Sequence, residues 1–194
     1  FTASAYASTT KRVAKPFNPL LGETFEYARP DKQYRFFAEQ VSHHPPISAT
    51  YTESPRWDFW GESYVDTHFN GRQFNVKHLG LWYINLLPNS TDRKELYTFK
   101  KPNNNVIGIL VGNPQVDNYG EVVITNHTTG DYCKLYFKAR GWRSSSAYEV
   151  KGEVFDKDNK KHWVLGGHWH DSIYAKHVNG KDKDEIALDH KKTH

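Results

Sequence analysis

The chain has 194 residues, of which 37% are hydrophobic, 25% charged and 15% aromatic. This composition predicts one folded domain with an aromatic core and excludes disorder over most of the chain. The sequence has no run of ~20 apolar residues and no charged-then-apolar segment at its start, so we expect neither a membrane-spanning helix nor a signal segment. The net charge of +4 is a mild bias toward phosphates, anionic membrane surfaces or nucleic acid, and the single Cys133 excludes an internal disulfide, so a reducing, cytoplasmic setting is expected.

The amino-terminal part of the chain, up to Glu23, lacks the alternation of a strand. A helix could begin within residues 2–13, but the prolines and the glycine of the sequence Lys15-Pro16-Phe17-Asn18-Pro19-Leu20-Leu21-Gly22-Glu23 predict an irregular loop after it. Such a loop presents backbone amides together with Lys15, although a lysine in a loop is usually just solvated. Lys11 and Arg12 could approach anionic lipid, or they could simply be exposed.

From residue 24 onward, short segments rich in β-branched and aromatic residues recur between turn sequences, which is the pattern of an all-β protein. So many strands exceed what one flat sheet carries, so we expect a closed or partly closed barrel, or two packed sheets. The predicted strands are 24–27, 34–41, 47–52, 59–67, 73–76, 81–86, 96–100, 106–110, 122–126, 132–137, 148–155, 163–169 and 172–177.

Four turn sequences lie between these segments and predict hairpin loops that join sequential antiparallel strands. They are Asn70-Gly71, Tyr119-Gly120, Thr129-Gly130-Asp131 and Lys157-Asp158-Asn159. The segment 148–155 alternates apolar residues with mostly charged ones, which is typical of a half-buried strand.

The most unusual stretch is Glu39-Gln40-Val41-Ser42-His43-His44-Pro45-Pro46. The two prolines cannot donate to a strand ladder, so they fix the two imidazoles at the end of a strand. A nearby phosphate favours the protonated imidazole, which donates from both ring nitrogens, and each such hydrogen bond contributes about 1.5–3 kcal/mol. The motif therefore suits anion binding, although a turn in which both histidines only cap backbone carbonyls is also consistent with it.

The two motifs together are far more specific than either alone. The sequence at residues 15–23, followed by the octapeptide at residues 39–46, resembles the lipid-binding domain of the oxysterol-binding protein family, whose fingerprint is that octapeptide. Stretches at residues 106–110, 126–131 and 163–169 are similar to the same family. The resemblance covers residues 1–177 and is closest to the long fungal members.

The resemblance implies an antiparallel, near-complete β-barrel with a hydrophobic tunnel that exchanges a sterol for phosphatidylinositol 4-phosphate between membranes. These two lipids are the expected ligands, with transient contact to a membrane surface at membrane contact sites and with no cofactor. His43 and His44 would bind the 4-phosphate, while Lys15, Phe17 and Asn18 would hold the rest of the head group at the tunnel mouth. Some relatives are thought to bind the phosphoinositide without a sterol, and that alternative stays open.

The resemblance also suggests how the chain is divided. Residues 1–178 would be the core barrel, without the family's amino-terminal lid and carboxy-terminal subdomain. Residues 179–194 would be a polar tail that is flexible or a truncated connection.

Other functions have weaker support in the sequence. Catalysis is not expected, because no Gly-x-Ser-x-Gly turn, metal signature or phosphate-binding glycine loop accompanies the histidines. The sequence His168-Trp169-His170 could chelate a metal, but no third ligand is identifiable and no metal site is expected. A β-barrel that binds single-stranded nucleic acid is a remote alternative, because Lys and Glu alternate along many strands and form no basic groove.

Overall fold

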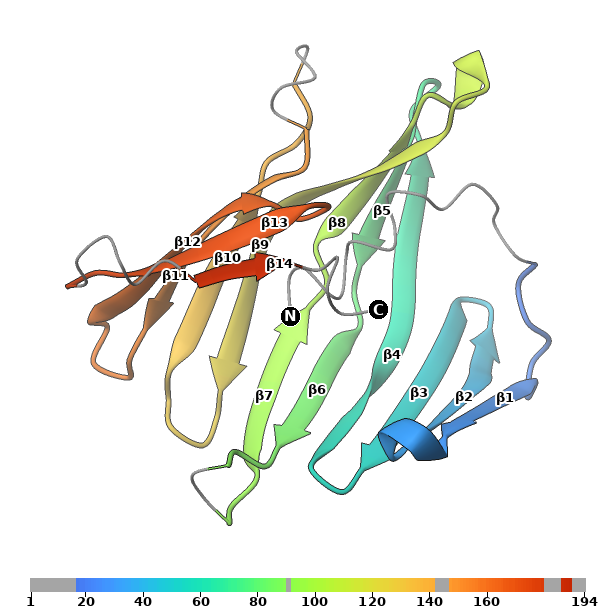
Figure 1. Ribbon diagram of the computed structural model, residues 1–194. Helices are drawn as coiled ribbons and strands as arrows, with labels where there is room; N and C mark the ends of the chain where they lie inside the picture. Colours follow the sequence, from blue (N-terminus) through green and yellow to red (C-terminus); the bar gives the residue numbers. More distant parts are fainter. Residues whose placement is uncertain (1–16, 90–91, 142–146, 180–185, 190–194) are drawn as a thin grey trace.

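Fourteen antiparallel strands form one strongly curved sheet in the computed structural model (Figure 1). The structure describes residues 17–89, 92–141 and 147–179, and the backbone of residues 186–189. This architecture confirms the predicted antiparallel all-β class. The elements are β1 (Thr24–Arg29), the 3₁₀ turn η2 (Pro30–Lys32), β2 (Tyr34–His43), β3 (Pro46–Ser54), β4 (Trp57–Phe69), β5 (Phe74–His78), β6 (Leu81–Leu86), β7 (Glu95–Lys100), β8 (Asn103–Ile107), the 3₁₀ turn η3 (Ile109–Val111), β9 (Gln115–Asn126), β10 (Tyr132–Phe137), β11 (Glu149–Phe155), β12 (Lys161–His168), β13 (Ser172–His177) and β14 (Ile186–Asp189).

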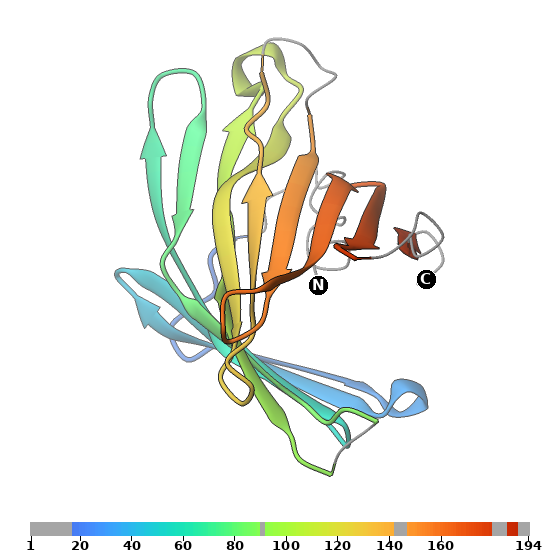
Figure 2. The same cartoon turned by 90° about the vertical axis from the view of Figure 1, so that its left-hand side faces the viewer.

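The sheet bends into a trough. Figure 2 shows the β1–β3 end and the β12–β14 end turned toward the same side. In the described part of the chain, no ladder joins β1 to β14, so both remain edge strands. The strand β14 was not predicted. It lies within residues 179–194, which the sequence analysis assigns to a polar tail, and it pairs with β13.

Two long strands each pair with two partners along one edge, and this branching departs from purely sequential pairing. The first half of β4 pairs with β6 and its second half with β5. In the same way, β9 pairs first with β8 and then with β7, while β10 follows its other edge. The branches let one continuous sheet curve sharply.

The prediction of a hairpin at Tyr119-Gly120 is wrong, because both residues lie inside β9. Tyr119 is the last residue of β9 that pairs with β8, so Gly120 marks the point where the strand changes partner. Gly120 has a φ of +94°, which a residue with a side chain rarely adopts. A glycine signal therefore reflects a bend within a strand here, rather than a turn between strands.

The predicted strand 106–110 is displaced in the structure. β8 ends at Ile107 because Gly108 adopts a left-handed conformation with φ of +74° and begins the turn η3. At its other end the strand includes asparagines, which disfavour strands on propensity alone. Side-chain hydrogen bonds from Asn75 to Asn105 (2.7 Å) and from Asn104 to Asn118 stabilise them there.

The register separates the sheet into two faces, because residues paired across antiparallel strands point to the same side. One face, which we call the apolar face, carries the hydrophobic core and includes Trp82, Phe99 and Leu135. The opposite, charged face carries ion pairs such as Arg35–Glu53 and Lys161–Glu153. Because the ion pairs face water, the apolar face is the one that the curved sheet encloses. The core residues are Trp82, Phe99, Val122, Leu135, Phe137, Val150, Trp169 and Ile173.

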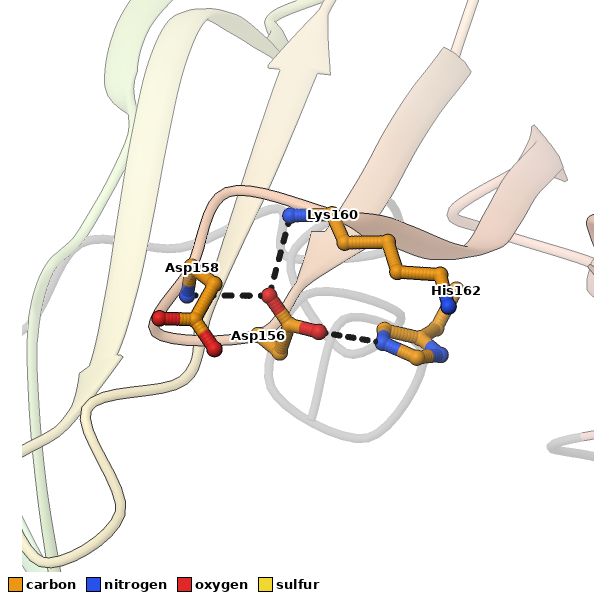
Figure 3. A network of polar contacts seen from close by, with 4 residues as sticks. All are labelled: Asp156, Asp158, Lys160 and His162. Atoms are coloured by element: carbon orange, nitrogen blue, oxygen red, sulfur yellow. Dashed lines mark hydrogen bonds and ion pairs between the residues drawn. The ribbon is translucent and has the colours of Figure 1, made fainter.

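The hairpin between β11 and β12 is confirmed at Lys157-Asp158-Asn159. Figure 3 shows how Asp156 organises it, with one carboxylate oxygen accepting from the backbone amides of Asp158 (3.0 Å) and Lys160 (2.9 Å). The other oxygen lies 2.7 Å from His162 Nε2. These hydrogen bonds hold the pKa of Asp156 below its ordinary value, with the bond to His162 contributing most.

Candidate functional site

The paired histidines occupy the turn that joins β2 to β3. His43 is the last residue of β2 and pairs with Pro46 at the start of β3, so His44 and Pro45 alone form the connection. The two imidazole rings lie 4.6 Å apart, with an angle of 63° between their planes. His43 is half-buried and His44 is exposed, so both rings can reach a ligand from outside the sheet.

Gln40 is the buried residue that organises this end of β2. Gln40 is only 2% exposed, and its Nε2 donates to the backbone oxygen of Ser42 (2.9 Å). The Ser48 hydroxyl donates to its Oε1. The sequence analysis did not assign a role to Gln40, although it belongs to the octapeptide, because its burial depends on the pairing of β2 with β3.

Gln40 also connects the amino-terminal loop to the histidine turn. Its backbone accepts from the amide of Gly22 (2.8 Å) and donates to the oxygen of Glu23 (3.0 Å), and its Nε2 lies 3.4 Å from Asn18 Oδ1. The other side of the Asn18 amide, Nδ2, lies 3.4 Å from Nδ1 of His43. Segments more than twenty residues apart in sequence are therefore held side by side.

Of the head-group residues expected from the sequence, the structure brings together Asn18, His43 and His44. Phe17 stands next to Asn18 but is 99% exposed, so its side chain does not pack against the described part of the sheet. Lys15, Lys11 and Arg12 lie outside the described residues, as does the helix considered for residues 2–13.

Two open hollows are lined by residues of β1, β2 and β3. One, of about 340 Å³, lies over β1, β2 and β3 and includes Phe25, Ala38 and Thr50, and the other, of about 540 Å³, lies at the opposite end of these strands near Tyr34. None of Asn18, His43 and His44 lines either hollow. The histidine turn thus lies outside both hollows, at one end of β2 and β3.

A second polar group lies on the apolar face, and the sequence analysis missed it. His78 Nε2 lies 2.6 Å from Asn104 Oδ1, and Asn104 in turn donates to Asn118. Asn118 is fully buried, and its Nδ2 has no partner among the described residues. Burial lowers the pKa of His78, and the nearby Lys101 lowers it further. This row of hydrogen bonds therefore ends in a buried donor without a partner among the described residues.

Lys101 lies near His78, and it has no carboxylate partner in the described part of the protein. Its Nζ is 3.8 Å from the ring centroid of Trp82, a cation–π contact on the apolar face. Burial lowers the pKa of Lys101 to about 8. The amine adds a further donor to the polar group at His78.

The structure places His168 at the end of β12 and His170 in the turn that follows it, and it places the single thiol, Cys133, in β10. The rings of His168 and His170 lie 6.0 Å apart, and no cluster of three metal-binding side chains exists among the residues described. Cys133 is half-buried on the apolar face, and burial raises the pKa of its thiol to about 11. A thiol with so high a pKa is a poor nucleophile.

Comparison with known proteins decides the family. The model of the oxysterol-binding protein family matches residues 1–194, which is the whole chain. The chain belongs to the oxysterol-binding protein family. This family is named for binding rather than for catalysis, and the resemblance expected from the two motifs is confirmed.

The similar proteins include curated relatives and solved domains. The chain is 75% identical to oxysterol-binding protein homolog 2 and 69% identical to oxysterol-binding protein homolog 1, both of Saccharomyces cerevisiae, with the whole chain covered in each case. The structure of the Osh1 ORD domain in complex with ergosterol matches 95% of the chain, with a TM-score of 0.85 and 67% identity. The structure of the Osh3 ORD in complex with PI(4)P from Saccharomyces cerevisiae matches 87% of the chain, with a TM-score of 0.74 and 27% identity.

The chain is much shorter than these oxysterol-binding proteins. It spans 15% of homolog 2 and 16% of homolog 1, and 44% of the solved Osh1 domain. Among the residues that the structure describes, no helix has both the length and the apolar character needed to cross a bilayer.

Proposed function

We propose that this chain is the barrel portion of a lipid-transfer domain that exchanges a sterol for phosphatidylinositol 4-phosphate between membranes. In this proposal residues 1–178 form the barrel together with the added strand β14, and the domain acts without catalysis at membrane contact sites, as a peripheral cytoplasmic protein. The observation that carries it is the connection through Gln40, which holds Asn18 within 3.4 Å of His43 beside the ring of His44.

This geometry suits a phosphate monoester. The two imidazoles and the Asn18 amide supply several donors within a small region, and a phosphate has acceptor oxygens for all of them. The 4-phosphate would contact His43 and His44, and the remainder of the inositol phosphate would contact Phe17 and Asn18. Lys15, three residues before Asn18, would add a positive charge, and Lys11 and Arg12 would contact anionic lipid. The Osh3 complex with PI(4)P supports this class of ligand.

The apolar face of the sheet favours a sterol as the second ligand over binding of the phosphoinositide alone. Its buried aromatic and aliphatic side chains suit a rigid hydrocarbon. The Osh1 complexes with ergosterol and cholesterol support this class of ligand.

The test is lipid extraction from liposomes by the full-length protein, with sterol and phosphatidylinositol 4-phosphate measured separately. The double substitution His43→Ala and His44→Ala removes two charge-assisted hydrogen bonds, so phosphoinositide extraction should fall roughly 100-fold or more while sterol extraction is retained. The matched control is His127→Ala with His162→Ala, two histidines outside the site, which should leave both extractions unchanged. Equal loss of both lipids from a folded protein with the site substitutions would refute this division of roles.

A further inference from the structure

The turn between β4 and β5 carries an asparagine that is followed by glycine (Figure 1). Phe69 pairs with Phe74, so the hairpin predicted at Asn70-Gly71 is confirmed and residues 70–73 form the connection. Gly71 has a φ of +87°, and no atom lies within 4 Å of the place where a Cβ would stand. The backbone nitrogen of Gly71 is therefore not crowded by a side chain on its own residue.

The side chain of Asn70 is turned toward the backbone that follows it. Its Oδ1 accepts from the amides of Arg72 and Gln73, each at 3.1 Å, and its Nδ2 lies 3.4 Å from Oδ1 of Asn75. Two backbone amides that donate to one carbonyl oxygen stabilise the negative charge that develops there during a nucleophilic attack. The carbon Cγ of Asn70 is thus polarised, and the backbone nitrogen of Gly71 is the nucleophile that the chain itself holds beside it.

We propose that Asn70 is a site of spontaneous deamidation, in which the Gly71 nitrogen acts as an internal nucleophile and water is the co-reactant. The Gly71 nitrogen forms a bond to Cγ of Asn70, the Cγ–Nδ2 bond breaks, and ammonia leaves with the proton that the Gly71 amide gives up. Water then opens the succinimide ring at either of its carbonyls, which leaves aspartate or isoaspartate. Asn179 is also followed by glycine, but Gly180 lies outside the described residues, so the proposal is confined to Asn70.

Asn126 provides a comparison within the same sheet. Its Oδ1 also accepts from the amides two and three residues further along the chain, at 2.9 and 3.2 Å. However, Asn126 is only 5% exposed, and the amide of His127 that would attack it already donates to the oxygen of Leu96 (2.8 Å). In the part of the chain that the structure describes, no backbone oxygen accepts from the Gly71 amide. The two asparagines therefore share a polarised carbonyl, and only Asn70 has an available nucleophile.

The two products should affect the turn differently. Aspartate keeps a side-chain oxygen at the position that accepts from the amides of Arg72 and Gln73. Isoaspartate instead carries an additional methylene group in the backbone, which moves the carboxylate away from that position. The isoaspartate form should therefore lose both hydrogen bonds, and residues 70–73 should open more readily.

The test incubates the full-length protein at physiological pH and temperature and follows each asparagine by peptide mass spectrometry. Asn70 should convert at least about tenfold faster than Asn126, because attack at Asn126 must first break the hydrogen bond of the His127 amide. Asn70 should also convert at least as fast as the same residue in a free peptide of residues 68–73, and the rate should rise with pH because the attacking amide must lose its proton. This comparison is made within wild-type protein, so it does not depend on the folding of a variant.

Two variants separate the steps. Asn70→Gln keeps the amide but places its carbonyl one carbon farther from the backbone, so residue 70 should stay unmodified. Asn70→Asp carries the aspartate product alone, so hydrogen exchange at the amides of Arg72 and Gln73 should stay slow in this variant and become faster only in incubated wild-type protein that contains isoaspartate.

Three results would overturn the proposal. A rate at Asn70 no higher than at Asn126 would show that the available Gly71 amide does not decide the reaction. A rate in the folded protein below that of the peptide would show that the hydrogen bonds at Oδ1 protect the side chain and do not activate it. Conversion of residue 70 in Asn70→Gln at the rate of the wild type would show that the Gly71 nitrogen is not the nucleophile.

Discussion

Replacing Gln40 with methionine tests whether the Gln40 side chain connects the amino-terminal loop to the histidine turn. Methionine has a similar volume, so the change removes hydrogen bonds without opening a cavity. It leaves the oxygen of Ser42 and the hydroxyl of Ser48 without their partner in a region where Gln40 is only 2% exposed. Each unsatisfied buried group costs about 1–3 kcal/mol, so the free energy of unfolding should fall by about 2–4 kcal/mol.

The assay is urea denaturation of the full-length protein, combined with titration of inositol 1,4-bisphosphate. The head group should bind more weakly to Gln40→Met, because Asn18 loses its contact with Nε2 and is no longer held beside His43. Gln73→Met, in the turn before β5, is the matched control and should change neither quantity by more than about 0.5 kcal/mol. If Gln40→Met is as stable as the wild type and binds the head group as tightly, the Gln40 side chain does not connect the loop to the histidine turn.

Three further predictions concern the sheet. Gly120→Val should lower the free energy of unfolding by about 1–3 kcal/mol in urea, since its φ is +94°, whereas Gly166→Val, where an added Cβ meets no atom within 4 Å, should cost less. Lys101→Met should raise the free energy of unfolding at pH 7 by about 1–3 kcal/mol, because burial of the charged amine lowers the pKa of Lys101 to about 8. Above pH 8 the folded wild type loses this proton before the unfolded chain does, so the wild type gains stability. The difference between variant and wild type should therefore close toward pH 10. Asp156→Asn should be less stable than the wild type above about pH 5, and since the pKa of Asp156 is lowered in the folded state, this difference should disappear as the pH falls below about 4.

Each of these predictions has a contradicting result. Equal losses at Gly120 and Gly166 would show that the backbone conformation of β9 is not the cause. A loss of stability in Lys101→Met at pH 7 would show that the cation–π contact with Trp82 outweighs the desolvation of the amine. A difference between Asp156→Asn and the wild type that persists in acid would show that the carboxylate does not act through its charge, and Asp158→Asn provides the control.

Local patterns were sufficient to predict most of the sheet. Alternation and turn chemistry depend on neighbours in sequence, so the strands from β1 to β7 and the hairpin at Lys157-Asp158-Asn159 could be located without a structure. The errors arose where long-range pairing decides. Gly120 bends a strand because β9 changes partner there, and the asparagines of β8 form a strand because Asn75 and Asn118 supply side-chain partners.

The candidate site was predictable to the same extent. The octapeptide indicated His43 and His44 as an anion site, and the family resemblance implied Asn18, because both motifs are contiguous in sequence. That these segments meet depends on Gln40, whose burial follows from the pairing of β2 with β3. The group of His78, Asn104 and Asn118 was not predictable, because its members lie on three strands and no local pattern connects them.

The most direct test of the account is a crystal structure of the full-length protein with a short-chain phosphatidylinositol 4-phosphate. The account predicts that the 4-phosphate lies within hydrogen-bond distance, about 2.7–3.2 Å, of both His43 and His44, with the Asn18 amide beside the inositol ring. A phosphate bound elsewhere, with the two imidazoles facing only water, would contradict it.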